Sequence, residues 1–412
     1  MKFKGVKLAF FAVALVFLLF FSNDFGLIDV EKTAIITAVA IDPETDGSYK
    51  VTAQIAVPEA TDTNTENERA QISGTGATVG AAIKNIGDTS GWFPQLCFCN
   101  LIIVGGSFTD YNIVKILDYF SKTLRVQDSA LIVMAENSGA ELLKLSTPLD
   151  NISAFALQKI LLKNAGLNRD VATTDVKKFC TGYYSDARSC YMPIIKVISQ
   201  KEENEKASAE DGNGGESGNG SGQSTGGQSS PQSLGGAKGD AIFNASCTAL
   251  FLEGKKVGEL DEKLTFAFNA LTQDLSATTF EVKNVETSTD TRNYLLTIFS
   301  CTPRRELIAT ENGLRLDISL DIYARISDEN AEYSDVDYVK NVPVPYFLKE
   351  KAESDLRANL EDLVRTEIQT GCDFLGIKKE LYGRYNSLYR KYKDDYLQRL
   401  SFDVRVNVSG QK

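Results

Sequence analysis

The sequence predicts an α+β protein of mixed α/β character. We expect three domains with mostly antiparallel sheets and packed helices, after an amino-terminal membrane anchor or signal. Three observations predict this arrangement: a short apolar run at the start, β-branched runs that alternate with helical periodicity, and one long polar tract. The 412 residues are 43% hydrophobic and 24% charged, which is ordinary for folded protein. At roughly 100–200 residues per domain, this length corresponds to two or three domains.

Composition excludes several classes of function. The formal charge of −11 argues against a nucleic-acid partner, because binding phosphates requires a basic surface. The chain has no histidine, which excludes Ser-His-Asp catalysis, Cys-His catalysis and histidine metal sites. A hydrolase could use a Ser–Lys pair instead, but we find no such motif. We therefore expect a protein that is not an enzyme, and assign no catalytic, cofactor-binding or metal-binding residue.

Residues 1–26 read as a signal or membrane anchor. Lys2, Lys4 and Lys7 precede an unbroken apolar run, Leu8–Phe21. Fourteen residues in a helix span about 21 Å, less than the roughly 30 Å of a bilayer core, and a basic start with a short apolar run is typical of a secretion signal. The lysines should stay in the cytoplasm and the rest of the chain should cross the membrane. No Ala-x-Ala-like cleavage site follows, so we favour an uncleaved anchor; a cleaved signal is the open alternative.

The next region, 27–142, predicts an α/β domain. Two β-branched runs, 33–41 and 49–57, flank Asp46-Gly47, which can supply the positive φ of a tight hairpin turn. Thr78 is a suitable N-cap for a helix over 79–86. The remaining elements alternate between strands and helices, which favours a mixed sheet: strand 96–104, helix 110–124 and strand 129–134.

The seven cysteines do not suggest a small disulfide-stapled scaffold. Cys97 and Cys99 should project from one face of the strand over 96–104, where a mutual disulfide would be strained. No second ligand pair accompanies them, so we expect small buried apolar side chains and not a metal site. Cys180 and Cys190 could close a loop in an oxidising compartment, and their disulfide state stays open.

A middle domain is predicted over 143–205, with helices near 151–165 and 170–183 and an extended run over 191–198. The composition then changes abruptly. Residues 206–240 are almost entirely Gly, Ser, Gln, Asn, Glu and Ala. Such a segment has little apolar surface to offset the entropy of ordering, so we predict a disordered Gly/Ser-rich tract.

The carboxy-terminal α+β domain is predicted over 241–412. A second hairpin should turn at Glu253-Gly254, and the last run, 401–408, places its valines on one face of a strand. A helix over 349–370 carries an apolar stripe, for which core packing is favoured over partner binding. The other expected elements are extended runs at 277–285, 292–300 and 313–325, and a Tyr-rich helical stretch over 378–397.

Four tyrosines recur at helical spacing in that last stretch: Tyr382, Tyr385, Tyr389 and Tyr392. Aromatic residues at this spacing serve in cores and at their rims more often than as ligand platforms, so packing is the favoured interpretation and a ligand platform the alternative.

Several stretches of the chain stand in a characteristic order: Asp29–Asp42, Tyr49–Pro58, Gly76 to Thr78 with Ala82-Ile83, Leu101–Gly106, Arg125, Leu131–Ala135, Ala249–Phe251, Lys256–Leu260, Asp373–Gly376 and Phe402–Gly410. In this order they resemble the Ger(x)C family of spore germination proteins, the C subunits of germinant receptors. The resemblance covers most of 27–412 outside the Gly/Ser-rich tract. It departs from the family pattern in having no lipobox cysteine after the signal and no histidine before the strand near residue 101.

The resemblance implies a non-enzymatic subunit on the extracytoplasmic face of the spore inner membrane. It implies integral-membrane partners, one of them a transporter-like subunit and another a second membrane subunit, in a complex that senses small germinants. A different class of function stays open on the residues alone, namely an extracytoplasmic solute-binding protein. That class predicts a cleft with convergent polar groups between two domains.

Overall fold

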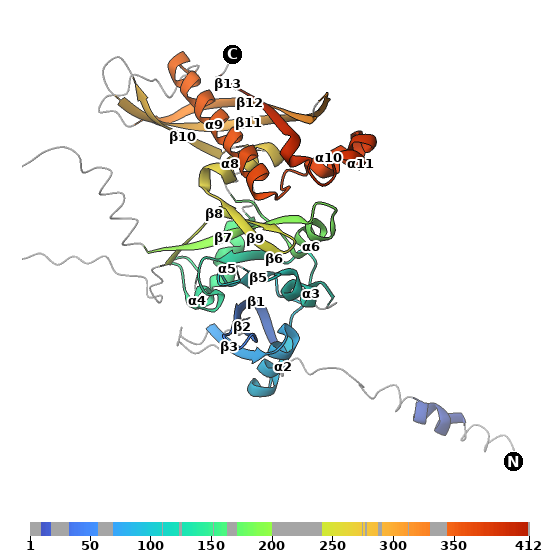
Figure 1. Ribbon diagram of the computed structural model, residues 1–412. Coiled ribbons are helices and arrows are strands. Elements are labelled where there is room, and N and C mark those ends of the chain that lie inside the picture. Colours follow the sequence, from blue (N-terminus) through green and yellow to red (C-terminus); the bar gives the residue numbers. More distant parts are fainter. Residues whose placement is uncertain are drawn as a thin grey trace, which may run out of the picture.

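The computed structural model describes two β-sheets with helices packed on them (Figure 1). This confirms the α+β class. The described residues are 10–17, 33–56, 69–108, 110–122, 126–150, 152–162, 171–199, 241–273, 275–276, 278–286, 291–311, 313–329 and 344–410.

The first sheet is mixed. Its strand order is β3-β2-β1-β5-β6-β7-β8-β9, and β4 pairs with the start of β1. The central strands β1, β5, β6 and β7 are parallel, whereas pairing at both ends of the sheet is antiparallel. The strands are β1 (Thr33–Pro43), β2 (Tyr49–Ala56), β3 (Arg69–Gly76), β4 (Phe93–Gln95), β5 (Leu101–Val104), β6 (Leu131–Ala135), β7 (Ser189–Ser199), β8 (Ala241–Leu252) and β9 (Lys255–Leu260).

Both predicted hairpins are confirmed. β1 and β2 pair antiparallel, and Gly47 at the turn has a φ of +82°. The β8–β9 turn places Glu253 and Gly254 at positive φ, which a glycine adopts without steric cost.

Helices cover both faces of the first sheet, and this explains its continuous apolar strands such as β5 and β6. On one face, α2 (Val79–Ser90), α3 (Val114–Lys122) and α6 (Val176–Tyr184) share a core. On the opposite face, α4 (Gly139–Lys144) and α5 (Ser153–Leu162) share a separate core. The predicted cap of α2 is confirmed, because the Thr78 hydroxyl accepts the Ala81 amide at 3.1 Å.

The prediction of one strand over 96–104 was wrong. A turn over 96–100 separates β4 from β5, with the Cys99 amide donating to the Leu96 carbonyl at 2.9 Å. Cys97 and Cys99 therefore lie in this turn and not on one strand face. Cys99 is buried, as expected of a small apolar side chain, whereas Cys97 is half-buried.

The second sheet has the order β10-β11-β12-β13, with β13 parallel to β12. The helices α8 and α9 cover one of its faces and share its core. The predicted stripe is confirmed, because Leu356, Leu360, Leu363 and Val364 of α9 are buried there. The elements are α8 (Glu262–Thr272), β10 (Thr278–Glu286), β11 (Thr291–Thr310), β12 (Gly313–Glu329), α9 (Tyr346–Thr370) and β13 (Leu400–Ser409).

The Tyr-rich stretch is two short helices and not one. α10 (Ile377–Arg384) ends where Tyr385 leaves helical geometry at φ −133°, and α11 (Asn386–Tyr392) then begins. A 3₁₀ turn, η3 (Leu397–Arg399), leads into β13. The break lets Tyr385 pack on the core while its hydroxyl donates to the Leu307 carbonyl at 3.2 Å.

Hydrogen-bonded strands continue across the predicted domain boundaries. β7 belongs to the predicted middle domain and β8 to the carboxy-terminal one, yet both lie in the first sheet. The domain boundaries stay a prediction. The Gly/Ser-rich tract, 206–240, lies outside the described residues.

Most of the predicted anchor also lies outside them. Residues 10–17 are helical, and the Phe10 side chain is 78% exposed. Within the described parts of the chain, no helix has the length and apolar character needed to cross a bilayer.

The α9 stripe provides a test of this core. We expect Leu360→Ala to lower the free energy of unfolding by about 2–5 kcal/mol, because it leaves a cavity at a side chain that is 1% exposed. Denaturant titration measures the change. Arg357→Ala, on the exposed face of α9, should shift it by less than about 0.5 kcal/mol. Equal losses in the two variants would contradict the packing described.

Candidate functional site

The two sheets meet at a cleft, which is the candidate site. One wall comes from α6 and the start of β7, and the other from the 373–376 loop, α10 and α11. α6 and the α10–α11 pair lie on the same side of the molecule (Figure 1). The cleft has a volume of about 630 Å³, which is within the usual range for small-molecule sites.

The inner surface of the cleft is largely apolar. Phe179, Cys190, Phe374 and Leu375 line it, and all four are buried side chains of the surrounding cores. Tyr191 of β7 lies among them and packs edge-on against the ring of Phe268 at 4.9 Å between centroids. These groups belong to the fixed cores of both sheets, so the floor of the cleft is preformed.

Asp186 joins the two walls at the rim of the cleft. This residue follows α6, and its carboxylate accepts a hydrogen bond from the Tyr389 hydroxyl of α11. Its backbone carbonyl accepts one from the Lys378 ammonium of α10 at 3.1 Å. The bond to Asp186 raises the pKa of the Tyr389 hydroxyl. Tyr382 stands beside Tyr389 at 5.1 Å in an edge-to-face contact and is 59% exposed.

Four cations line the cleft, against two carboxylates. Arg305 donates to the Leu375 carbonyl at 2.6 Å and lies 3.7 Å from Glu380, and Lys378 is held by Asp186. Lys178 of α6 donates to the Thr173 carbonyl at 3.3 Å and lies over the ring of Tyr191. Lys379 of α10 is exposed. Among the described residues, neither Lys178 nor Lys379 has a carboxylate partner.

The carboxylate of Asp373 organises the wall formed by the carboxy-terminal part. It accepts the backbone amides of Ile377 and Lys378 at 2.6 and 2.7 Å and the Tyr396 hydroxyl at 3.0 Å. The Asp373 amide donates to the Ser189 hydroxyl of β7 at 2.9 Å. One residue therefore fixes the start of α10 and also joins it to the first sheet.

A second carboxyl group, Glu367 of α9, is fully buried beside Asp373. Burial and the neighbouring Asp373 charge raise its pKa well above the usual range. One oxygen of Glu367 accepts a hydrogen bond from the Leu375 amide at 3.0 Å. Among the described residues, no donor lies within hydrogen-bond distance of the other oxygen. In its acid form, that oxygen can donate to Asp373. Burial and the neighbouring charge of Asp373 therefore both favour the acid form of Glu367 in the fold.

Three free cysteines from different elements lie near one another: Cys180 of α6, Cys190 of β7, which lines the cleft, and Cys372. The Cys372 thiol contacts the carbonyls of Phe251 at 3.3 Å and Cys190 at 3.9 Å. Burial raises the pKa of Cys372 to about 12 and also raises that of Cys190, so neither is a reactive thiolate at neutral pH. The loop-closing Cys180–Cys190 pair is not bonded in this structure.

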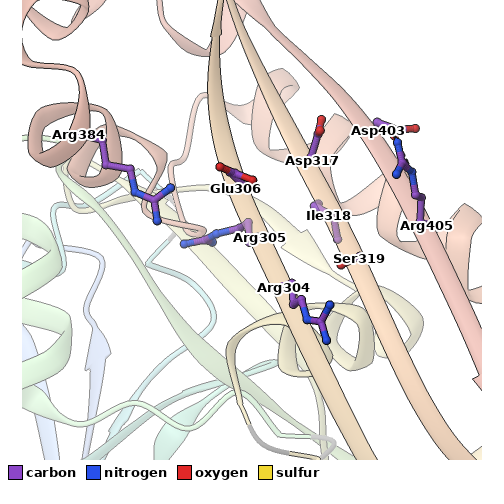
Figure 2. A pocket seen from close by; sticks show the side chains of 9 residues that line it. All are labelled: Arg304, Arg305, Glu306, Asp317, Ile318, Ser319, Arg384, Asp403 and Arg405. Carbon is purple, nitrogen blue, oxygen red and sulfur yellow. Dashed lines mark hydrogen bonds and ion pairs between the residues drawn. The ribbon is translucent and has the colours of Figure 1, made fainter.

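A second concavity lies on the outer face of the second sheet (Figure 2). It holds about 390 Å³ and is lined by side chains of β11, β12 and β13, with Arg384 reaching in from α10. Its arginines are held by carboxylates: Arg405 contacts Asp403 at 2.7 Å, and Arg384 lies 3.4 Å from Glu380. A groove with cations already paired offers less to a discrete ligand than the cleft does.

The sequence predicted no site residue, and the residues that form the cleft were missed for a physical reason. Its walls come from segments almost 200 residues apart in the chain. Of the four tyrosines, three pack on the core as favoured, namely Tyr385, Tyr389 and Tyr392. Tyr382 and Tyr389 line the cleft. Glu367 had a readable signal, because it continues the stripe of Leu360 and Val364 at helical spacing. Among the described residues, no group of three potential metal ligands is found.

Most of the chain is similar to domains of known protein families. The Spore germination protein N-terminal domain matches residues 27–197, and the Spore germination B3/ GerAC like, C-terminal domain matches residues 246–410. The crystal structure of the GerBC protein superposes with a TM-score of 0.50 at 13% identity, covering 92% of this chain and 99% of that one. This likeness supports the fold. No curated protein matches the chain by sequence.

A two-sheet α+β protein that matches both of these domain models is a spore germination protein. The chain belongs to the Ger(x)C family, and the resemblance expected from the sequence is confirmed.

The buried acid provides a test of the site. The pKa of Glu367 is raised in the folded chain. Its contribution to the free energy of unfolding is therefore fully present below the usual pKa of an unfolded Glu, about 4.3, and is lost as the pH rises from there through the pKa in the fold. The expected slope is about 1.4 kcal/mol per pH unit. Glu367→Gln keeps a neutral donor and should remove this slope in denaturant titrations at several pH values. Glu350→Gln, at an exposed position of α9, should leave it unchanged. A slope that persists unchanged in Glu367→Gln would show that it does not come from Glu367 and would contradict the raised pKa of this group.

Proposed function

We propose that the chain is a subunit of a spore germinant receptor in nutrient-triggered germination. The family match over both domains carries this proposal. In it, the protein acts through contacts with integral-membrane subunits, one of them transporter-like. Tethering to the same membrane raises the local concentration of the partners, so individually weak contacts suffice.

The proposed location is the extracytoplasmic face of the spore inner membrane. The basic start and the apolar run of residues 8–21 support it, because the lysines favour the cytoplasmic side. An uncleaved anchor formed by the apolar run is the proposed means of attachment.

We also propose that the protein is not an enzyme. The absence of histidine and the inert environment of Cys190 and Cys372 support this view. The buried acids Glu367 and Asp373 are engaged in hydrogen bonds to the backbone of the 373–378 segment.

Deleting the gene tests the receptor role. We expect purified spores of the deletion strain to lose the response to at least one nutrient germinant, while germination by a trigger that bypasses nutrient receptors is retained. Loss of refractility measures the response. The native gene restored in trans is the control. An unchanged response to every germinant, in a strain that also lacks paralogous subunits, would contradict the proposal.

A charge in the apolar run tests the anchor. We expect Leu15→Arg to move the full chain from the washed membrane fraction to the soluble fraction, because a charge at the centre of a membrane helix costs about 2.5–3.5 kcal/mol. Leu15→Ile is the matched control and should stay with the membrane. Mass spectrometry that finds a mature amino terminus beyond residue 21 would replace the anchor with a cleaved signal.

One observation favours a second candidate, an extracytoplasmic protein that itself binds a solute. The cleft between the two sheets has the volume, the apolar floor and the polar rim of a small-molecule site. A solute held there would contact both α6, which packs on the first sheet, and α10, which packs beside the second sheet. Binding would then favour one arrangement of the two walls, because a ligand stabilises the state that it contacts best.

A further inference from the structure

We propose that the cleft binds a small organic anion, a molecule with an apolar group and a carboxylate. The inference rests on the proposed solute binding and adds the chemistry of the ligand. The observation that carries it is the pair Lys178 and Lys379, which line opposite walls without carboxylate partners among the described residues.

The charges around the cleft favour an anion. Lys178, Arg305, Lys378 and Lys379 line it together with Asp186 and Asp373, which gives four positive and two negative groups, in a chain whose formal charge is −11. Both acids are already satisfied: Asp373 by two amides and the Tyr396 hydroxyl, and Asp186 by the Tyr389 hydroxyl and Lys378.

The two cations without a carboxylate partner among the described residues lie on opposite walls of the cleft. Lys178 belongs to α6 and Lys379 to α10, and both line the cleft, so the proposal places the carboxylate of the ligand between these two walls. Charge-assisted hydrogen bonds from ammonium groups to a carboxylate are about twice as strong as neutral ones. A cationic ligand would meet two ammonium groups that have no carboxylate partner in the described parts of the chain and would find the two carboxylates of the cleft already occupied.

The floor of the cleft determines the rest of the ligand. Phe179, Phe374 and Leu375 offer apolar contact, and the exposed ring of Tyr382 stands at the rim. A purely inorganic anion would leave this surface in contact with water, whereas an apolar group would bury it. The cleft of about 630 Å³ has room for a ligand of one ring or a branched chain.

Three matched probes test the charge of the ligand: phenylacetate, neutral phenylacetamide and cationic phenethylamine. The full chain, kept soluble in a mild non-ionic detergent, is titrated with each probe while its melting temperature is followed, since a ligand of the native state raises it. We expect phenylacetate to raise the melting temperature most, and the effect to weaken with added salt.

The variant Lys178→Gln/Lys379→Gln removes the two proposed contacts. Both side chains are exposed, so the fold should be preserved. We expect phenylacetate to bind about tenfold more weakly, to the level of phenylacetamide, which corresponds to the loss of about 1.4 kcal/mol. Lys177→Gln/Lys393→Gln removes the same total charge from exposed positions that do not line the cleft, and should bind phenylacetate like the native chain.

The outcomes separate the inference from the function on which it rests. If phenylacetamide or phenethylamine binds as tightly as phenylacetate, solute binding stands and the preference for an anion is overturned. If the control variant loses as much affinity as the cleft variant, the two lysines are not the binding groups and the inference is overturned. The probes are tested up to a concentration of about 10 mM, which detects even weak, millimolar ligands. If none of them binds, both the inference and the proposed solute binding fail.

Discussion

The joint between the two sheets depends on one buried residue, Asp373. The backbone amide of Asp373 donates to the Ser189 hydroxyl of β7, and its carboxylate accepts hydrogen bonds from the first amides of α10 and from the Tyr396 hydroxyl. Buried polar groups are costly unless they are hydrogen-bonded, so this arrangement fixes the loop, α10 and β7 together. Burial and the charge of Asp373 raise the pKa of Glu367 beside it, which favours one charge over two in this apolar space.

The cleft is a consequence of this joint. Because Asp373 fixes the start of α10 against β7, the helices α6 and α10 stand on either side of an apolar floor. The Asp186 contacts with Tyr389 and Lys378 connect the same walls at the rim. A solute in the cleft would therefore act on contacts that join the two parts of the chain.

Much of the fold was readable because its determinants are local. Asp46-Gly47 and Glu253-Gly254 predicted hairpins that the structure contains, and Thr78 predicted a cap. The errors also have local causes. The apolar character of 96–104 hid the turn that separates β4 from β5, and the tyrosine spacing concealed the break at Tyr385.

By itself, the sequence determined the α+β class, the hairpins, the buried stripe of α9 and membership of the Ger(x)C family, because periodicity and residue order suffice for these. Only the tertiary structure decided that β7 and β8 belong to one sheet and that Lys178 and Lys379 line one cleft. Contacts between segments so distant in the chain depend on how whole elements pack, and no local pattern encodes that packing.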